Sequence, residues 1–84
     1  MGKLSEMPNI GKVVEEQLIE VGIDTPEKLI EAGSEEAWIK LKGIDPSSCL
    51  MKLYGLEGAV RGIKKKDLPK DVKEKLKDFY NNYK

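Results

Sequence analysis

Glycine and proline divide this 84-residue chain into segments of helical length. Glycine suits the residue after a helix, because it readily adopts the left-handed conformation, and proline suits the first turn of the next helix. Glycines and prolines placed in this way occur, in chain order, at Gly22, Pro26, Gly33, Gly43, Pro46, Gly62 and Pro69. No segment alternates apolar and polar residues as a half-buried strand does. The pattern predicts an all-α fold of about five short helices.

The first three predicted helices span residues 11–21, 26–33 and 35–42. Apolar residues recur in them at intervals of three or four, which gives each helix one buried stripe. Asp24 or Thr25 is expected to cap the second helix and Ser34 the third, while Gly22 and Ile23 close the first in a Schellman-type turn. The residues expected to point inward are Ile10, Val14, Leu18 and Val21, then Leu29 and Ile30, then Ala37, Trp38 and Leu41.

The other two predicted helices span residues 47–62 and 69–82. The first is the most apolar and is expected to be central, with Leu50, Leu53, Tyr54, Ala59 and Val60 facing the core. Gly55 and Gly58 each cost about 1 kcal/mol relative to Ala inside a helix, so their stripe suggests that another helix backbone approaches closely. Gly62 is expected to end the helix. The last helix carries Val72, Leu76, Phe79 and Tyr83 on one face, and Asp71 and Lys75 are spaced to pair on another.

Single side chains outside these stripes are also given expected places. Trp38, Tyr54, Phe79 and Tyr83 lie at helical spacing on apolar faces, which favours core packing over a platform for stacked bases. Cys49 is expected to be a small buried residue near the start of the central helix.

The composition argues against catalysis. The chain has no histidine, which removes the usual general base and the commonest transition-metal ligand, and its single cysteine cannot build a thiolate zinc site. The adjacent pairs Glu15-Glu16 and Glu35-Glu36 point about 100° apart on a helix, so neither forms a convergent dyad. We expect no enzyme activity, no catalytic residue, no metal and no cofactor.

Length and residue usage also limit the class of protein. Eighty-four residues allow one small domain, predicted over residues 1–84. The apolar runs are far shorter than the roughly 20 residues that cross a bilayer, and no signal-peptide pattern opens the chain. A single cysteine requires no oxidising compartment, so a cytoplasmic location without membrane contact is expected.

A short hairpin at residues 7–12 is the first candidate site. An apolar residue, a proline, a residue that tolerates positive φ, an apolar residue and a glycine precede a helix there, as in helix-hairpin-helix domains. The first N–H groups of a helix favour a phosphate, and Lys12 adds a cation. The candidate phosphate or DNA ligands are Asn9, Ile10, Gly11 and Lys12. The alternative is a purely structural turn, and the carboxylates further along the helix would repel a duplex.

A basic stretch is the second candidate. It comprises Arg61, Lys64, Lys65 and Lys66. Three consecutive lysines are compatible with a solvated loop or with a contact to phosphate or protein, and the sequence leaves both open.

Several motifs, taken in order, resemble the C-terminal domain of the TfoX (Sxy) family. They are Met7-Pro8-Asn9-Ile10-Gly11, Val21 to Leu29, Ala37 to Lys42, Cys49 to Ile63 and Asp67-Leu68-Pro69. The resemblance implies a compact helix-hairpin-helix or SAM-like bundle without catalytic residues. It also implies relatives that regulate competence for DNA uptake. Two-domain relatives carry an N-terminal domain that this sequence lacks, so we expect a stand-alone version or an excised domain.

Charge is balanced in total but divided along the chain. Fifteen basic residues match fifteen acidic ones, yet residues 1–37 sum to −6 and residues 38–84 to +6. The first hypothesis is therefore a non-catalytic interaction module of a competence or transcription regulator, whose partner is a protein of the transcription machinery. The second is weak, sequence-independent DNA-backbone binding through residues 9–12.

Overall fold

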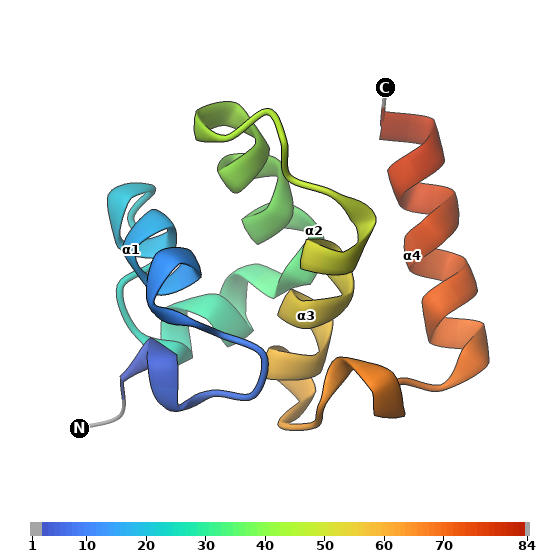
Figure 1. The fold of residues 1–84 in the computed structure, drawn as a ribbon, viewed down its shortest axis with the longest axis horizontal. Helices are drawn as coiled ribbons and strands as arrows, with labels where there is room; N and C mark the ends of the chain where they lie inside the picture. The colour runs from blue at the N-terminus through green and yellow to red at the C-terminus, as the bar shows by residue number, and fades with distance from the viewer. Residues whose placement is uncertain (1–2, 84) are drawn as a thin grey trace.

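Figure 1 shows the fold of the computed structural model, which describes residues 3–83. The elements are the 3-10 helix η1 (Leu4–Glu6), α1 (Lys12–Glu20), α2 (Pro26–Ile44), α3 (Leu50–Arg61), the 3-10 helix η2 (Lys65–Asp67) and α4 (Lys70–Tyr83). No strand occurs within residues 3–83. The prediction of an all-α fold is confirmed.

Within residues 3–83 the structure has four α-helices instead of about five, because the two predicted helices on either side of Gly33 form one kinked element, α2. Gly33 adopts φ 84° and ψ 163°, which is not helical and kinks α2 into the two predicted pieces. Ser34 is buried beside the kink, and its hydroxyl donates to the carboxylate of Glu57. The helical conformation is therefore interrupted at Gly33, where the stop was predicted, and it resumes directly afterwards.

The other helix boundaries follow local chemistry. The N–H of Ile23 donates to the carbonyl of Leu18 at 2.8 Å, that of Gly22 to Ile19 at 3.0 Å, and Gly22 has φ 90°. These bonds form the predicted Schellman turn. Thr25 caps α2, since its hydroxyl accepts from the N–H of Lys28 at 3.1 Å.

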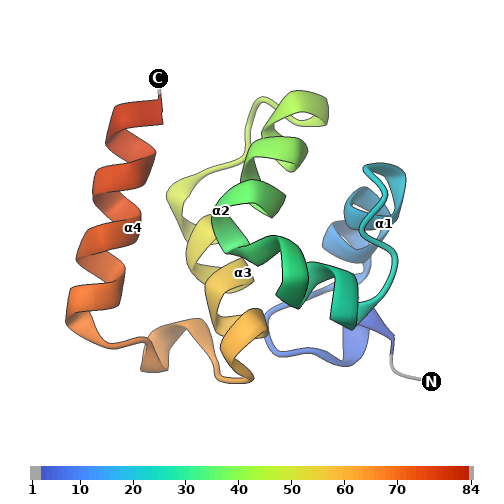
Figure 2. The ribbon, with the colours of Figure 1, turned by 180° about the vertical axis from the view of Figure 1, so that it is seen from behind.

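Trp38 of α2 is the centre of the core, where α2 packs against α3. Figures 1 and 2 show α1 and α4 on opposite sides of the α2–α3 pair. The indole ring contacts Phe79, Tyr80 and Tyr83 of α4 in edge-to-face geometry, with centroid distances of 5.0 to 5.9 Å. Its Nε1–H donates to the carbonyl of Cys49 at 3.1 Å. The buried apolar residues are Leu4, Ile10, Leu18, Ile23, Leu29, Ala37, Trp38, Leu41, Leu53, Leu56, Ala59, Leu68 and Leu76.

Two core predictions are wrong. Ile30 is 53% exposed, because α2 turns only Leu29 inward at that point and the next position lies about 100° further round the helix. Cys49 is exposed, because α3 begins at Leu50, three residues later than predicted. Cys49 then lies in the connecting loop, and Ser48 takes the buried place. Tyr83, placed on the apolar face, contacts Trp38 but is 40% exposed.

Among residues 3–83, no helix combines the length and the apolar character that a membrane-spanning segment needs.

Candidate functional site

The hairpin predicted as a phosphate site is a tight turn centred on Asn9. Asn9 has φ 69°, in the left-handed region that asparagine tolerates better than most non-glycine residues. The N–H of Ile10 donates to the carbonyl of Met7 at 3.3 Å, which closes the turn. Ile10 is buried and anchors the turn in the core, whereas Asn9, Gly11 and Lys12 are exposed.

The side chain of Asn9 connects this turn to α3 and to the chain that follows it, 46 to 56 residues away. Its Nδ2 donates to the carbonyls of Gly55 at 3.3 Å and Ile63 at 3.0 Å, and its Oδ1 accepts from the N–H of Lys65 at 3.1 Å. We call these three bonds the Asn9 clasp. The clasp places the hairpin directly beside residues 64–66, which we call the lysine segment.

The two glycines on α3 make room for the clasp. A Cβ atom on Gly58 would lie 2.5 Å from Asn9 Nδ2 and 2.6 Å from the Ile63 carbonyl oxygen, whereas one on Gly55 would lie 3.5 Å from Asn9 Cβ. A close approach was predicted for this stripe. The approaching groups are the hairpin turn and, at Gly58, the chain that follows α3, and not the backbone of another helix.

The N-terminus of α1 lies in the same hairpin. Gly11 precedes the helix, and no side chain caps it. The first N–H groups of an α-helix have no partner within the helix and carry the positive end of its dipole. The carboxylate of Glu15, one turn into α1, accepts from the N–H of Ser5 at 3.0 Å and so is held toward η1.

The lysine segment meets the hairpin at Lys65, whose backbone N–H donates to Asn9 Oδ1. Lys64, Lys65 and Lys66 are exposed, and within residues 3–83 none of them has a carboxylate within ion-pair distance. Arg61, predicted to belong with them, pairs with Glu57 on another part of α3. We call the exposed group formed by Asn9, Gly11, Lys12 and residues 64–66 the hairpin surface. The hairpin and the three lysines, which were predicted as parts of two separate sites, therefore lie side by side. Arg61, the fourth member of the predicted basic stretch, is paired with Glu57 instead.

A small groove opens beside the hairpin surface, between the start of α1 and α3. It has a volume of about 220 Å³. Its lining residues are Asn9, Ile10, Val14, Met51, Lys52, Gly55, Leu56 and Lys65. The groove thus combines an apolar interior with two lysines.

The ammonium group of Lys52, which lines the groove, already has three acceptors within hydrogen-bond distance. Its Nζ lies 3.0 Å from Gln17 Oε1, 3.1 Å from Asp45 Oδ2 and 3.3 Å from Ser48 Oγ. Hydrogen bonds from Ser47, Lys52 and Gln17 hold the pKa of Asp45 well below its usual range. This network was not predicted, because Gln17 is 28 residues from Asp45 and 35 from Lys52, and no helical spacing brings it to them.

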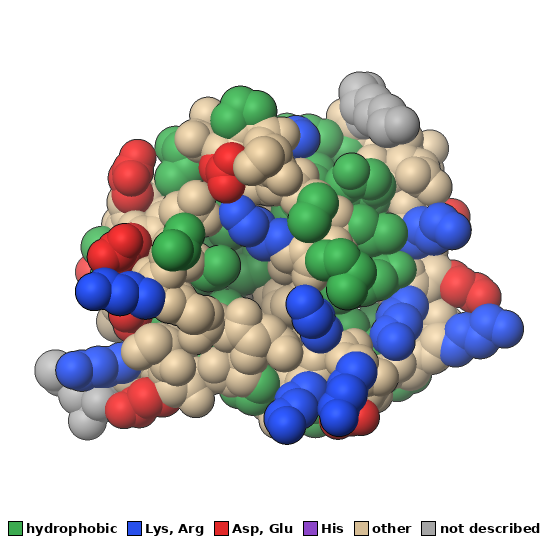
Figure 3. Space-filling view, viewed as in Figure 1, with side chains coloured by type: hydrophobic (Ala, Val, Ile, Leu, Met, Phe, Trp, Pro, Cys, Tyr) green, Lys and Arg blue, Asp and Glu red, His purple; other side chains and the backbone are tan. Residues whose placement is uncertain are grey.

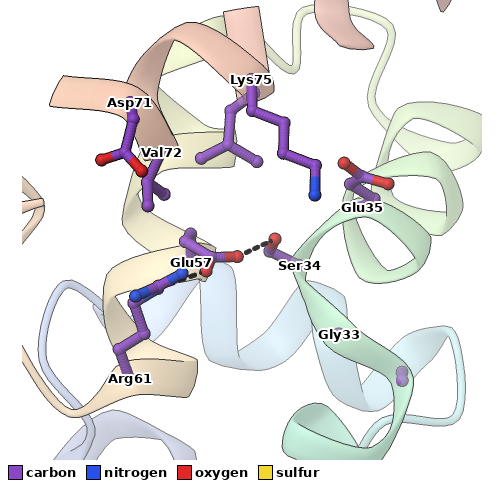
Figure 4. Close-up of a pocket in the computed structure, with 10 residues that line it drawn as sticks. Gly33, Ser34, Glu35, Glu57, Arg61, Asp71, Val72 and Lys75 are labelled. Carbon is purple, nitrogen blue, oxygen red and sulfur yellow. Dashed lines mark hydrogen bonds and ion pairs between the residues drawn. The ribbon is translucent and has the colours of Figure 1, made fainter. Parts of the chain in front are cut away.

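A larger cleft, of about 510 Å³, lies between the α2 kink, α3 and α4 (Figure 4). Glu57 points into it and contacts both Ser34 and Arg61. Partial burial raises the pKa of Glu57, but the hydrogen bonds from Ser34 and Arg61 and the charges of Arg61 and Lys75 outweigh burial and lower it. The carboxylate is therefore ionised and tied to its neighbours.

The Asp71–Lys75 pair expected from sequence does not form an ion pair in the structure. Figure 4 shows both side chains at the cleft, with Lys75 extending toward Glu35 and Asp71 on the opposite side. Within residues 3–83, no group of three histidine, cysteine or acidic residues is placed to hold a metal ion. In the cleft, the Ser34 hydroxyl and the Arg61 guanidinium are both bound to the Glu57 carboxylate.

The division of charge along the chain is visible on the molecule. On the face in Figure 3, red carboxylates gather at the left edge, where Figure 1 places α1. Most blue side chains lie over the centre and the lower right, toward η2 and α4.

The family model for the TfoX C-terminal domain matches residues 1–80. Among solved structures, an uncharacterized protein from Listeria monocytogenes in a triclinic crystal form is 47% identical, with a TM-score of 0.95 over 96% of this chain and 92% of that one. A protein of unknown function from the same organism, in a tetragonal form, is also 47% identical, with a TM-score of 0.93 over 96% of this chain and 99% of the other. No curated protein matches the chain significantly.

Proposed function

The chain belongs to the TfoX C-terminal domain family, as the sequence motifs predicted, and on that premise we propose that it is a non-catalytic interaction module of a cytoplasmic competence or transcription regulator. The interaction that its geometry supports best is sequence-independent binding of a nucleic-acid backbone at the hairpin surface. The observation that carries this proposal is the Asn9 clasp, which joins a helix N-terminus to three exposed lysines.

The chemistry of the hairpin surface suits phosphate. The uncapped N-terminus of α1 presents backbone N–H groups, and Lys12 and residues 64–66 supply ammonium groups that neutralise negative charge. The exposed side chains there are mostly point charges, which position a phosphate backbone without reading base edges. Binding is therefore expected to be independent of sequence.

The acidic residues of α1 limit the contact. Glu16 and Glu20 are exposed further along the helix and would repel a backbone laid parallel to it. Glu15 lies in the first turn itself and is held toward η1, so the phosphates are confined to the exposed N–H groups at the start of α1 and to the lysine segment. With only a few phosphate contacts, the affinity is weak and falls steeply as salt increases.

A titration of the domain with a short DNA duplex at low salt, followed by amide chemical shifts, tests this proposal. We expect the largest shifts at Gly11, Lys12 and Lys65. Lys12→Glu and Lys65→Glu should each weaken binding and reduce the slope of log K against log salt by about 0.9. Lys40→Glu, an equal charge change at an exposed site on α2, is the control. If all three variants bind alike, the hairpin surface is not the site.

A second candidate function is contact with a protein of the transcription machinery. The observation that favours it is the exposure of Val13 and Ile19 on α1 and Ile30 on α2, at 66%, 51% and 53%, within the acidic part of the chain. Exposed apolar groups among carboxylates suit a partner with a basic, partly apolar surface. Pull-down with purified transcription components at moderate salt should retain a partner that Ile30→Asp releases. Failure to retain any component would count against this candidate.

A further inference from the structure

The groove between α1 and α3 is apolar inside. Leu56 and Ile10 are 1% and 6% exposed and form its floor, and Val14 and Met51 complete the apolar lining. Met51 is 51% exposed, so its thioether remains accessible to a ligand. A volume of about 220 Å³ is below the roughly 300–1,000 Å³ of pockets for drug-sized ligands, and it suits a single ring system.

The groove and the hairpin surface are continuous. Asn9 and Lys65 line the groove and also form part of the clasp, so a group in the groove lies beside the exposed lysines. Because the ammonium of Lys52 is held by three acceptors, Lys65 is the lining cation available to a ligand. The occupant should therefore carry a flat apolar part next to a phosphate.

We propose that this groove binds an unpaired nucleobase, so that the hairpin surface prefers single-stranded to double-stranded nucleic acid. The inference rests on the proposed backbone binding. A duplex keeps its bases stacked and offers phosphates and sugars, which leaves the groove empty, whereas a single strand can turn a base out beside a bound phosphate. Apolar side chains hold such bases by their faces, and methionine adapts its shape to them.

No aromatic side chain lines the groove, so sequence-tolerant stacking of the kind that aromatic platforms give is absent. The preference for a single strand is therefore moderate. We expect up to about a tenfold difference in affinity at the same salt concentration.

Fluorescence anisotropy at low salt, with the 84-residue chain and three probes, tests this inference. The probes are a twelve-nucleotide single strand, the same sequence as a duplex, and inorganic polyphosphate. Met51→Ser should lower single-strand affinity toward the duplex value and leave the other two probes unchanged. Met51→Phe should raise single-strand affinity, because an aromatic face stacks on the base. Ile39→Ser, at a 38% exposed site on α2, is the matched control and should change nothing.

The outcomes separate this inference from the proposed function. Binding of duplex and polyphosphate without a single-strand preference overturns the nucleobase site and leaves backbone binding intact. The site is also overturned if Met51→Ser and Met51→Phe leave the single-strand affinity unchanged, or if Met51→Ser weakens all three probes equally. Absence of binding to every probe overturns backbone binding, and the nucleobase site with it.

Discussion

Replacing Gly58 by alanine tests the packing that holds the hairpin in place. The added methyl group would lie 2.5 Å from Asn9 Nδ2 and 2.6 Å from the carbonyl oxygen of Ile63, so the turn or the chain after α3 must move. Overpacking of this kind costs about 1–3 kcal/mol. Displacing the Asn9 amide loses hydrogen bonds worth about 1 kcal/mol each. Alanine has a higher helix propensity than glycine, which offsets about 1 kcal/mol of this loss.

The free energy of unfolding should therefore fall by about 2 kcal/mol in Gly58→Ala. For a domain of this size, that lowers Tm by roughly 8–16 °C. Gly55→Ala is the matched control, because its methyl group would meet Asn9 Cβ at an ordinary 3.5 Å. There the gain in helix propensity should dominate and raise stability by up to about 1 kcal/mol.

Thermal unfolding followed by circular dichroism measures both changes. In an Asn9→Gly background, the turn keeps its positive φ but the amide is gone, so Gly58→Ala should cost less than it does in the parent chain. A Gly58→Ala variant that melts at or above the parent temperature would refute the reasoning. Equal costs in the two backgrounds would show that the Asn9 amide does not contribute to the contact.

Three further predictions concern stability elsewhere in the domain. Trp38→Phe removes the donor to the Cys49 carbonyl and should cost about 1–3 kcal/mol in urea unfolding; an unchanged midpoint would contradict this. Gly62→Ala places a side chain at φ 77° and should lower the free energy of unfolding, measured thermally, by about 1–2 kcal/mol. Asp45 has a lowered pKa in the folded state, so its stabilising contribution is present above the unfolded value of about 3.9 and is lost as pH falls. Urea midpoints between pH 6 and 2 should thus fall less for Asp45→Asn than for the parent, and parallel profiles would exclude this role.

Most helix boundaries could be predicted because local chemistry determines them. Gly22 and Gly62 have positive φ and end helices, and Thr25 caps the helix that Pro26 opens. Each depends on the conformational range of one residue and on hydrogen bonds within a few positions. Gly33 shows where this reasoning stops. A stop was predicted there and a new helix soon after it, but sequence alone did not indicate that the two helices would join in one kinked element.

The errors at Ile30 and Cys49 have a different cause. Periodicity indicates which residues share a face, but the width of the buried stripe depends on how closely the neighbouring helix approaches. α2 buries Leu29 completely and leaves Ile30 more than half exposed. At the start of α3, Pro46 suggested an earlier first turn, whereas the loop is held by Asp45 and the helix begins at Leu50.

The candidate site was predictable in its parts and not in its assembly. The hairpin and the lysine segment each have a local signature, but their contact depends on one side chain that reaches Ile63 and Lys65. The available signal was indirect. Two costly glycines on one stripe of α3 indicated that something approaches closely, and Asn9 occupied the position where helix-hairpin-helix turns have glycine. Sequence spacing could not identify Asn9 as the approaching residue.

Asparagine at position 9 gives the hairpin side-chain hydrogen bonds that glycine could not make. Glycine would allow the same positive φ at lower conformational cost in the folded turn, but it would leave the hairpin attached mainly through Ile10. With Asn9, the turn also bonds to the carbonyl groups of Gly55 and Ile63 and to the N–H of Lys65. Any movement of the hairpin away from α3 must break these bonds. The hairpin and the lysine segment are therefore held together by the fold, which would reduce the ordering cost of the proposed backbone binding. A chain with zero net charge can thus present a local cationic surface, because the fold fixes a few cations in one place.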